Sequence, residues 1–136
     1  MGQGYWLVKQ EPTKYSFDDL VRDKRTMWEG VRNFQARKNL ASMRRGDAVL
    51  FYRSVEEPAV VGICEVVKEA YPDPTADDPR WVAVDLKAGR KLARPVPLAE
   101  IRAEPALRDI PLVRQARLSV MPLERAAFER IVQLGE

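Results

Sequence analysis

The sequence contains no histidine and only one cysteine among its 136 residues, and both scarcities restrict its chemistry. Without histidine there can be no Ser/His triad, no Cys/His pair and no ordinary zinc site. Cys64 has no partner for an intrachain disulfide, and the apolar run AVVGICEVV around it predicts a buried core thiol in a reducing compartment. We therefore expect no metal and no cofactor. Any catalysis would depend on Lys, Glu, Asp, Tyr or Ser side chains.

Long apolar runs are also absent: none approaches the roughly 20 residues that a membrane-spanning helix needs. The opening segment MGQGYWLVKQEP has neither the basic region nor the apolar core of a secretory signal. Hydrophobic residues make up 46% of the chain, a content typical of globular proteins. We expect a cytoplasmic monomer without a membrane anchor, folded as one domain over residues 1–136.

Charge is small overall but unevenly distributed. The formal net charge is +3, yet residues 32–53 carry six cations and one acid, whereas residues 65–79 carry five acids and one lysine. A basic face of this kind suits a polyanionic partner, which makes nucleic acid the first partner to consider.

The N-terminal third predicts a strand and two helices. Loose alternation in YWLVKQEP, stopped by Pro12, favours a strand with Trp6 and Val8 on one face. Ser16 then suits a helix N-cap, with Asp19 completing a capping box, although its hydroxyl is equally suited to a ligand contact.

The second helix is expected to begin at Asn33, another good N-cap, and to stop near Gly46. Near-helical spacing predicts that its apolar side chains share one face. These are Phe34, Ala36, Leu40 and Met43.

The remainder reads mainly as strands followed by a helix. Residues 48–54 and 59–71 are rich in β-branched and aromatic side chains and predict a hairpin closed by VEEP. YPDPTADDP predicts a loop, and residues 81–96 a strand pair turning at AGR. RLSV predicts a last strand, and the apolar stripe in PLERAAFERIVQLG a final helix ending at Gly135. The fold class is therefore α+β, built on a small closed or nearly closed β-sheet.

Several of these segments, in this order, resemble the EVE domain, the family of the thymocyte nuclear protein within the PUA-like superfamily. They are YWLVKQEP, YSFDDL, WEGVRNFQARKNL, RRGDAVLFYRS, VVGICEVVKEAYPDPTADDPRWVAVDL and RLSV. The resemblance extends from Tyr5 to the final helix. It implies a PUA-like β-barrel with peripheral helices, and a pocket that reads a modified base in DNA or RNA, with a 5-substituted cytosine as the expected base.

The segment WEGVRNFQARKNL, residues 28–40, contains the residue types that such a pocket needs. Trp28 offers a face for base stacking, although a tryptophan is more often a core aromatic. Val31 suits an apolar base substituent, and Asn33 suits a polar base edge. Arg32 is expected beside the base, and Arg32, Arg37 and Lys38 are expected to hold flanking phosphates.

The other candidates for the pocket come from three short segments. They are Lys9, Glu11 and Ser16 near the first strand, Tyr52 and Ser54 in FYRS, and Arg117 and Ser119, which would share a face of a strand over RLSV. Because Phe51 and Tyr52 point to opposite faces of their strand, only one of them can line the pocket, and Tyr52 has the polar tip for it.

Arg53 is a departure from the family pattern. Related sequences commonly read FYHS where this chain reads FYRS. A fixed cation in place of an imidazole argues against a proton-shuttling role, and we expect Arg53 to contact phosphate.

Three functional interpretations follow. The first is a binding module that captures a modified base without reacting with it, since no histidine, metal site or activated nucleophile is visible. The second is a small hydrolase of modified nucleosides that uses Lys9, Glu11 and Ser16, which requires a desolvated lysine. The third is a fold kept for protein contact alone.

Overall fold

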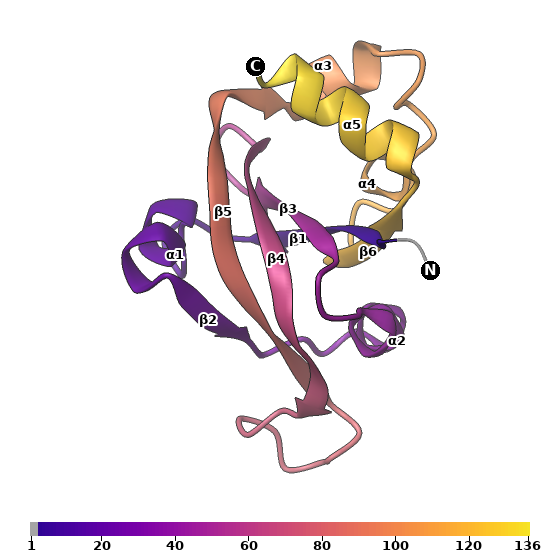
Figure 1. The fold of residues 1–136 in the computed structure, drawn as a ribbon. Coiled ribbons are helices and arrows are strands. Elements are labelled where there is room, and N and C mark those ends of the chain that lie inside the picture. Colours follow the sequence, from indigo (N-terminus) through magenta and orange to yellow (C-terminus); the bar gives the residue numbers. More distant parts are fainter. Residues whose placement is uncertain (1–2) are drawn as a thin grey trace.

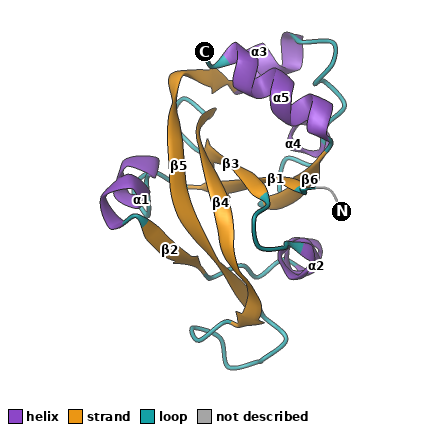
Figure 2. Cartoon of the chain, in the orientation of Figure 1, coloured by secondary structure: helices purple, strands orange, loops and turns teal. Residues whose placement is uncertain are grey.

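Six strands form one twisted sheet in the computed structural model, which describes residues 3–136 (Figures 1 and 2). The strands are β1 (Tyr5–Gln10), β2 (Arg25–Trp28), β3 (Ala48–Arg53), β4 (Ala59–Pro72), β5 (Val82–Pro97) and β6 (Val120–Leu123). Their order across the sheet is β2-β5-β4-β3-β1-β6. The β1–β3 pair is parallel and the other pairs are antiparallel.

Five helices lie around this sheet, which confirms the α+β class and the peripheral helices. They are α1 (Phe17–Asp23), α2 (Phe34–Ser42), α3 (Leu98–Ala103), α4 (Pro111–Arg114) and α5 (Arg125–Leu134). Figure 1 shows α3, α4 and α5 gathered at one end of the sheet, while α1 and α2 lie on opposite sides of β4 and β5 in this view. No helix among residues 3–136 is long and apolar enough to cross a membrane.

The expected barrel is not closed. Within residues 3–136 the outer strands β2 and β6 do not pair with each other. Helix α2 contacts β4, β5 and β6. It therefore packs its side chains over part of the gap between β2 and β6, where a closed barrel would have backbone hydrogen bonds. The sheet is therefore an open relative of a barrel.

The predicted β3–β4 hairpin is confirmed. Val55, Glu56 and Glu57 in its loop all have positive φ angles, between 44° and 60°. The Arg53 guanidinium donates two hydrogen bonds, of 3.1 and 2.9 Å, to the Glu57 carbonyl oxygen. Arg53, the residue that departs from the family pattern, therefore stabilises a strained loop.

The turn expected at AGR is wrong, because residues 88–90 lie inside the continuous strand β5. Opposite the step from Gly62 to Cys64, β5 advances from Ala88 to Lys91, so it carries one extra residue, as in a β-bulge. Gly89 fits this bulge because a Cβ there would lie 2.5 Å from the Ile63 carbonyl oxygen.

The strand predicted over RLSV is displaced toward the C-terminus. Strand β6 begins at Val120, and Arg117 and Ser119 precede it, so the argument that they share a strand face is wrong. Pro122 lies within β6, where an edge strand tolerates it. Similarly, α2 ends at Ser42, before Gly46, whose φ of 96° instead serves the turn into β3.

The core fills the space between the sheet and the helices. Leu7, Leu20 and Leu50 are fully buried, and α5 buries Ala127, Phe128 and Ile131 as its stripe predicted. Cys64 is buried as expected, and desolvation raises the pKa of its thiol. This thiol is therefore unreactive at neutral pH.

Candidate nucleic-acid interface

The turn between β2 and α2 contains three of the predicted site residues, Val31, Arg32 and Asn33, and Trp28 ends the strand before it. Gly30 has a φ of 81°, a left-handed conformation that glycine adopts without strain. The Trp28 ring is only 5% exposed and packs edge-on against Phe51, with ring centroids 5.6 Å apart. Val31 is 8% exposed. This packing supports the core interpretation of Trp28, and the stacking role of its ring stays a prediction.

A buried carboxylate ties this turn to the loop between β4 and β5. Asp73 accepts hydrogen bonds from the Gly30 backbone N–H at 2.8 Å and from Arg32 Nη1 at 3.0 Å. It also accepts bonds from the backbone and hydroxyl of Thr75, at 2.7 and 2.6 Å. Desolvation alone would raise the pKa of Asp73, but the hydrogen bonds from Thr75, Gly30 and Arg32 lower it to about 2. Arg32 is therefore held by Asp73 at the edge of the turn.

Next to this turn lies a surface group that we call the aromatic–arginine cluster: the exposed Phe34 and Arg32 and the partly buried Trp81 and Arg37. Phe34 is 68% exposed and stacks on Trp81, with centroids 5.4 Å apart and planes 24° apart. The Arg37 guanidinium carbon lies 5.0 Å from the Phe34 centroid and 4.8 Å from the Trp81 centroid, and that of Arg32 lies 5.8 Å from Trp81. These distances are typical of cation–π contacts.

The cluster corrects one prediction and contains two aromatic residues that were not among the predicted site residues. Phe34 was expected on the apolar face of α2, and its exposure shows that this placement is wrong. Trp81 was not predicted as a site residue. The available signal was the spacing of Phe34 and Arg37, which places an aromatic and a cation on neighbouring turns of one helix face.

Asn33 begins α2 as predicted. Its side-chain oxygen accepts a 2.9 Å hydrogen bond from the Ala36 backbone N–H, as an N-cap should. That oxygen is therefore committed to the helix, and the amide NH2 is the group left to meet a base edge. Lys38, further along the same helix, is exposed.

A second feature of the region is a cavity of about 330 Å³ beside β2, which we call the Tyr15 cavity. It is lined by Gln10, Lys14, Tyr15, Thr26, Met27, Trp28, Glu29 and Gly30. Of the predicted pocket residues, only Trp28 lies in its wall. Gln10 and Tyr15 were not predicted, although both flank the predicted Glu11 and Ser16 in the sequence.

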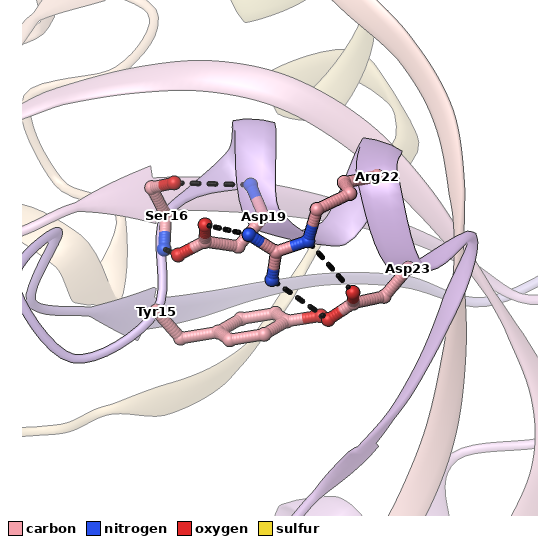
Figure 3. A network of polar contacts seen from close by, with 5 residues as sticks. All are labelled: Tyr15, Ser16, Asp19, Arg22 and Asp23. Atoms are coloured by element: carbon pink, nitrogen blue, oxygen red, sulfur yellow. Dashed lines mark hydrogen bonds and ion pairs between the residues drawn. The ribbon is translucent and has the colours of Figure 1, made fainter.

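Polar contacts fix the position of the Tyr15 ring (Figure 3). The Tyr15 hydroxyl donates a 2.9 Å hydrogen bond to Asp23 Oδ2. Arg22 donates to both Asp23 and Asp19, at 3.0 and 3.1 Å, and so links the partner of Tyr15 to the first turn of α1. Burial raises the pKa of Tyr15, so its hydroxyl is a neutral donor at physiological pH.

Ser16, at the start of the same network, acts as a helix cap (Figure 3). Its Oγ accepts a 3.0 Å bond from the Asp19 N–H, and Asp19 Oδ2 accepts a 2.9 Å bond from the Ser16 N–H, which together form a capping box. The capping prediction is confirmed. Ser16 also borders a separate cavity of about 400 Å³ with Phe51 and Arg53.

Lys9 and Tyr52 face a third and smaller cavity, of about 160 Å³, which Ser54 also lines. Lys9 Nζ donates a 2.8 Å hydrogen bond to the Ala116 carbonyl and lies 5.7 Å from the Tyr52 ring centroid. Burial lowers the pKa of Lys9 and raises that of Tyr52. Phe51 borders the 400 Å³ cavity instead, so the two neighbouring aromatics do face different spaces.

The predicted hydrolase constellation does not assemble. Lys9 lines the 160 Å³ cavity and Ser16 the 400 Å³ cavity, while Glu11 forms a 3.5 Å ion pair with the exposed Lys14. General acid–base and nucleophilic roles require such groups within about 3 Å of one another or of a shared substrate. This geometry gives the hydrolase interpretation no support.

The remaining predicted residues lie at the surface. Arg117 is exposed and Ser119 is partly buried in the segment before β6. The Ser119 backbone carbonyl accepts a 2.9 Å hydrogen bond from the Lys9 N–H, so this segment continues alongside β1. Ala116, just before this segment, lines the 160 Å³ cavity, and neither Arg117 nor Ser119 lines the Tyr15 cavity.

Comparisons with known proteins place the chain in a family. The EVE domain family model matches residues 4–134. Human thymocyte nuclear protein 1 is 35% identical over 97% of this chain and 74% of its own length. The solution structure of Rpa0253 from Rhodopseudomonas palustris superposes with a TM-score of 0.92 at 42% identity, covering 97% of this chain and 92% of that one.

Two further structures are relevant to recognition. Human THYN1 in complex with 5-methylcytosine-containing DNA superposes with a TM-score of 0.90 at 34% identity, covering 98% of each chain. A YTH domain of Zygosaccharomyces rouxii, in complex with N6-methyladenosine RNA, has a TM-score of 0.60 at 17% identity over 98% of this chain and 87% of its own, and so shares the fold alone. Together with the family model, these similarities confirm the resemblance seen in the sequence: the chain belongs to the EVE domain family.

Proposed function

We propose that this chain is a nucleic-acid-binding module that captures a 5-substituted cytosine. The observation that carries the proposal is the similarity, over 98% of both chains, to a protein whose structure holds 5-methylcytosine-containing DNA. The segregated basic segment supports it independently, because cations that neutralise phosphates supply most of the sequence-independent affinity for nucleic acid.

Within this proposal, the Tyr15 cavity receives the base. Its volume of about 330 Å³ is at the lower end of small-molecule sites, which suits a single ring. Tyr15 offers an aromatic wall whose orientation is fixed by Asp23. Gln10 Oε1 already accepts a 2.9 Å bond from the Glu11 N–H, and its NH2 group, which has no partner among residues 3–136, can donate to an acceptor on the base edge.

The predicted phosphate contacts remain part of the proposal. Arg37 and Lys38 on α2 and Arg32 on the preceding turn are proposed to hold phosphates on one side, Arg53 is a more distant phosphate candidate, and Arg117 remains a proposed ligand contact. Val31, Asn33 and the Lys9–Tyr52–Ser54 group remain proposed ligand contacts that binding would have to bring into reach. We also retain a monomer and a cytoplasmic location as expectations.

Titrations of Tyr15 variants test where the base is captured. Fluorescence anisotropy would measure the affinity for single-stranded oligonucleotides that carry one cytosine or one 5-methylcytosine in the same sequence. We expect Tyr15→Leu to reduce the preference for the methylated strand and Tyr15→Phe, which keeps the ring, to retain it. Unchanged preference in Tyr15→Leu would place capture in another cavity. A matched RNA pair would decide between DNA and RNA.

A further inference from the structure

Phe34 is the most exposed large aromatic side chain of the described chain, at 68%. It is the first residue of α2, and its ring packs on Trp81 instead of the core. An aromatic ring exposed to water forgoes the favourable hydrophobic free energy that burial in the core would provide. The exposed stack beside the turn of residues 28–33 is therefore a candidate surface for binding a ligand.

The cluster is pre-organised by buried polar contacts. Asp73, whose side chain is fully buried, holds both Gly30 and Arg32 on one side and Thr75 on the other. The backbone N–H of Asp73 donates a 2.8 Å hydrogen bond to the Trp81 carbonyl oxygen, which fixes the position of the Trp81 backbone. Phe34 and Trp81 thus meet through a network that needs no ligand to form.

The charge around the stack favours an anion. Within residues 3–136 neither Arg37 nor Lys38 forms an ion pair. The nearby Asp78 is paired with Arg80 at 2.8 Å, and Asp73 with Arg32 at 3.0 Å. Two unpaired cations therefore stand next to an exposed aromatic face, which is the combination that single-stranded nucleic acid uses.

We propose that the aromatic–arginine cluster stacks an unpaired base that flanks the captured one. The occupant is a base of a single strand or of a locally opened duplex, because paired bases keep their faces covered by their neighbours. The base stacks on Phe34, while Arg37 and Lys38 neutralise the adjoining phosphates. This inference rests on the proposed nucleic-acid function, but it does not depend on which base is modified.

The test compares Phe34→Ala, Phe34→Tyr and Phe34→Leu in the full chain. Anisotropy titrations would use single strands that carry cytosine or 5-methylcytosine, and a blunt duplex of the same sequence. We expect Phe34→Ala and Phe34→Leu to bind both single strands about 5- to 150-fold more weakly, the range that one stacked base provides. Phe34→Tyr keeps the aromatic face and should bind as the wild type does. Val21→Ala, which trims an exposed apolar residue of α1, is the matched control and should change nothing.

The outcomes separate this inference from the proposed function. Equal weakening toward methylated and unmethylated strands supports a flanking contact, even if the wild type shows no preference between them. Three results would overturn it. They are unchanged affinity in Phe34→Ala, loss of methyl preference alone, and equal weakening toward the blunt duplex. Self-association that disappears in Phe34→Ala, with unchanged oligonucleotide affinity, would instead assign the cluster to contact between copies.

Discussion

Trp28 and Phe34 lie six residues apart and occupy opposite environments. Trp28 is 5% exposed and packs against Phe51, so Trp28→Ala should leave a cavity and cost about 3–5 kcal/mol of unfolding free energy. Phe34→Ala, at a site 68% exposed, should cost only about 1 kcal/mol, the worth of one aromatic pair. Denaturant unfolding of both variants measures the difference. A Trp28→Ala protein as stable as the wild type would contradict the core role and favour base stacking by Trp28.

Asp73 makes the stability of the fold depend on pH in the acid range. Its pKa is about 2 when folded against an ordinary value of 3.8, so the carboxylate stabilises the fold above pH 4, and this contribution disappears as the pH falls from 4 toward 2. The shift corresponds to about 2 kcal/mol. Asp73→Asn should lose about that much stability at neutral pH and show a flatter decline between pH 4 and 2.

Asp78 provides the control for Asp73. The pKa of Asp78 is also about 2, because of its bonds from Arg80, but the pair lies on an exposed loop. Exposed ion pairs contribute little to stability, so Asp78→Asn should leave the melting curve nearly unchanged at every pH. If the two asparagine variants behaved alike, the network at Asp73 would not stabilise the turn.

At the scale of single elements, helix α1 distinguishes two roles for Ser16. Ser16→Ala should cost about 0.5–2 kcal/mol through loss of the cap, and Ser16→Gly only a few tenths, because glycine is tolerated at an N-cap. Both variants lack the hydroxyl. A ligand role therefore predicts that both lose affinity equally, whereas a purely capping role predicts unchanged affinity and unequal thermal stability.

The elements that sequence predicts well are those with local causes. Ser16 and Asn33 begin helices because their side chains bond backbone N–H groups within the same turn, and the α5 stripe repeats over its own length. The β3–β4 hairpin likewise closes through neighbouring residues. Each of these signals is complete within a few positions of the chain.

The features that escaped prediction depend on distant contacts. Gly89 marks a bulge and not a turn, because the Ile63 carbonyl approaches it from the neighbouring strand. Phe34 is exposed because Trp81, far along the chain, provides its partner. The Tyr15 cavity combines the end of β1 with the last three residues of β2. Periodicity and propensity within one segment contain no information about any of these.

At the scale of the whole molecule, the uneven charge predicts how binding responds to salt. Each neutralised phosphate contributes about 0.9 to the slope of log affinity against log salt for duplex DNA and about 0.7 for single strands. Replacing both Arg37 and Lys38 by Gln should therefore flatten the slope by about 1.4 to 1.8. Replacing Arg90 and Arg114, exposed cations of β5 and α4, provides the control. Identical slopes for the wild type and the α2 double variant would remove α2 from the interface.

Recognition of the modified base is tested most directly by one affinity ratio. Wild-type protein would be titrated, at fixed low salt, with two single strands that differ only in the methyl group of one cytosine. Burying that methyl group is worth about 0.8 kcal/mol, so the account predicts affinity for the 5-methylcytosine strand at least about four-fold higher. Equal affinity for the two strands would contradict it, and would leave a nucleic-acid-binding protein that does not read this modification.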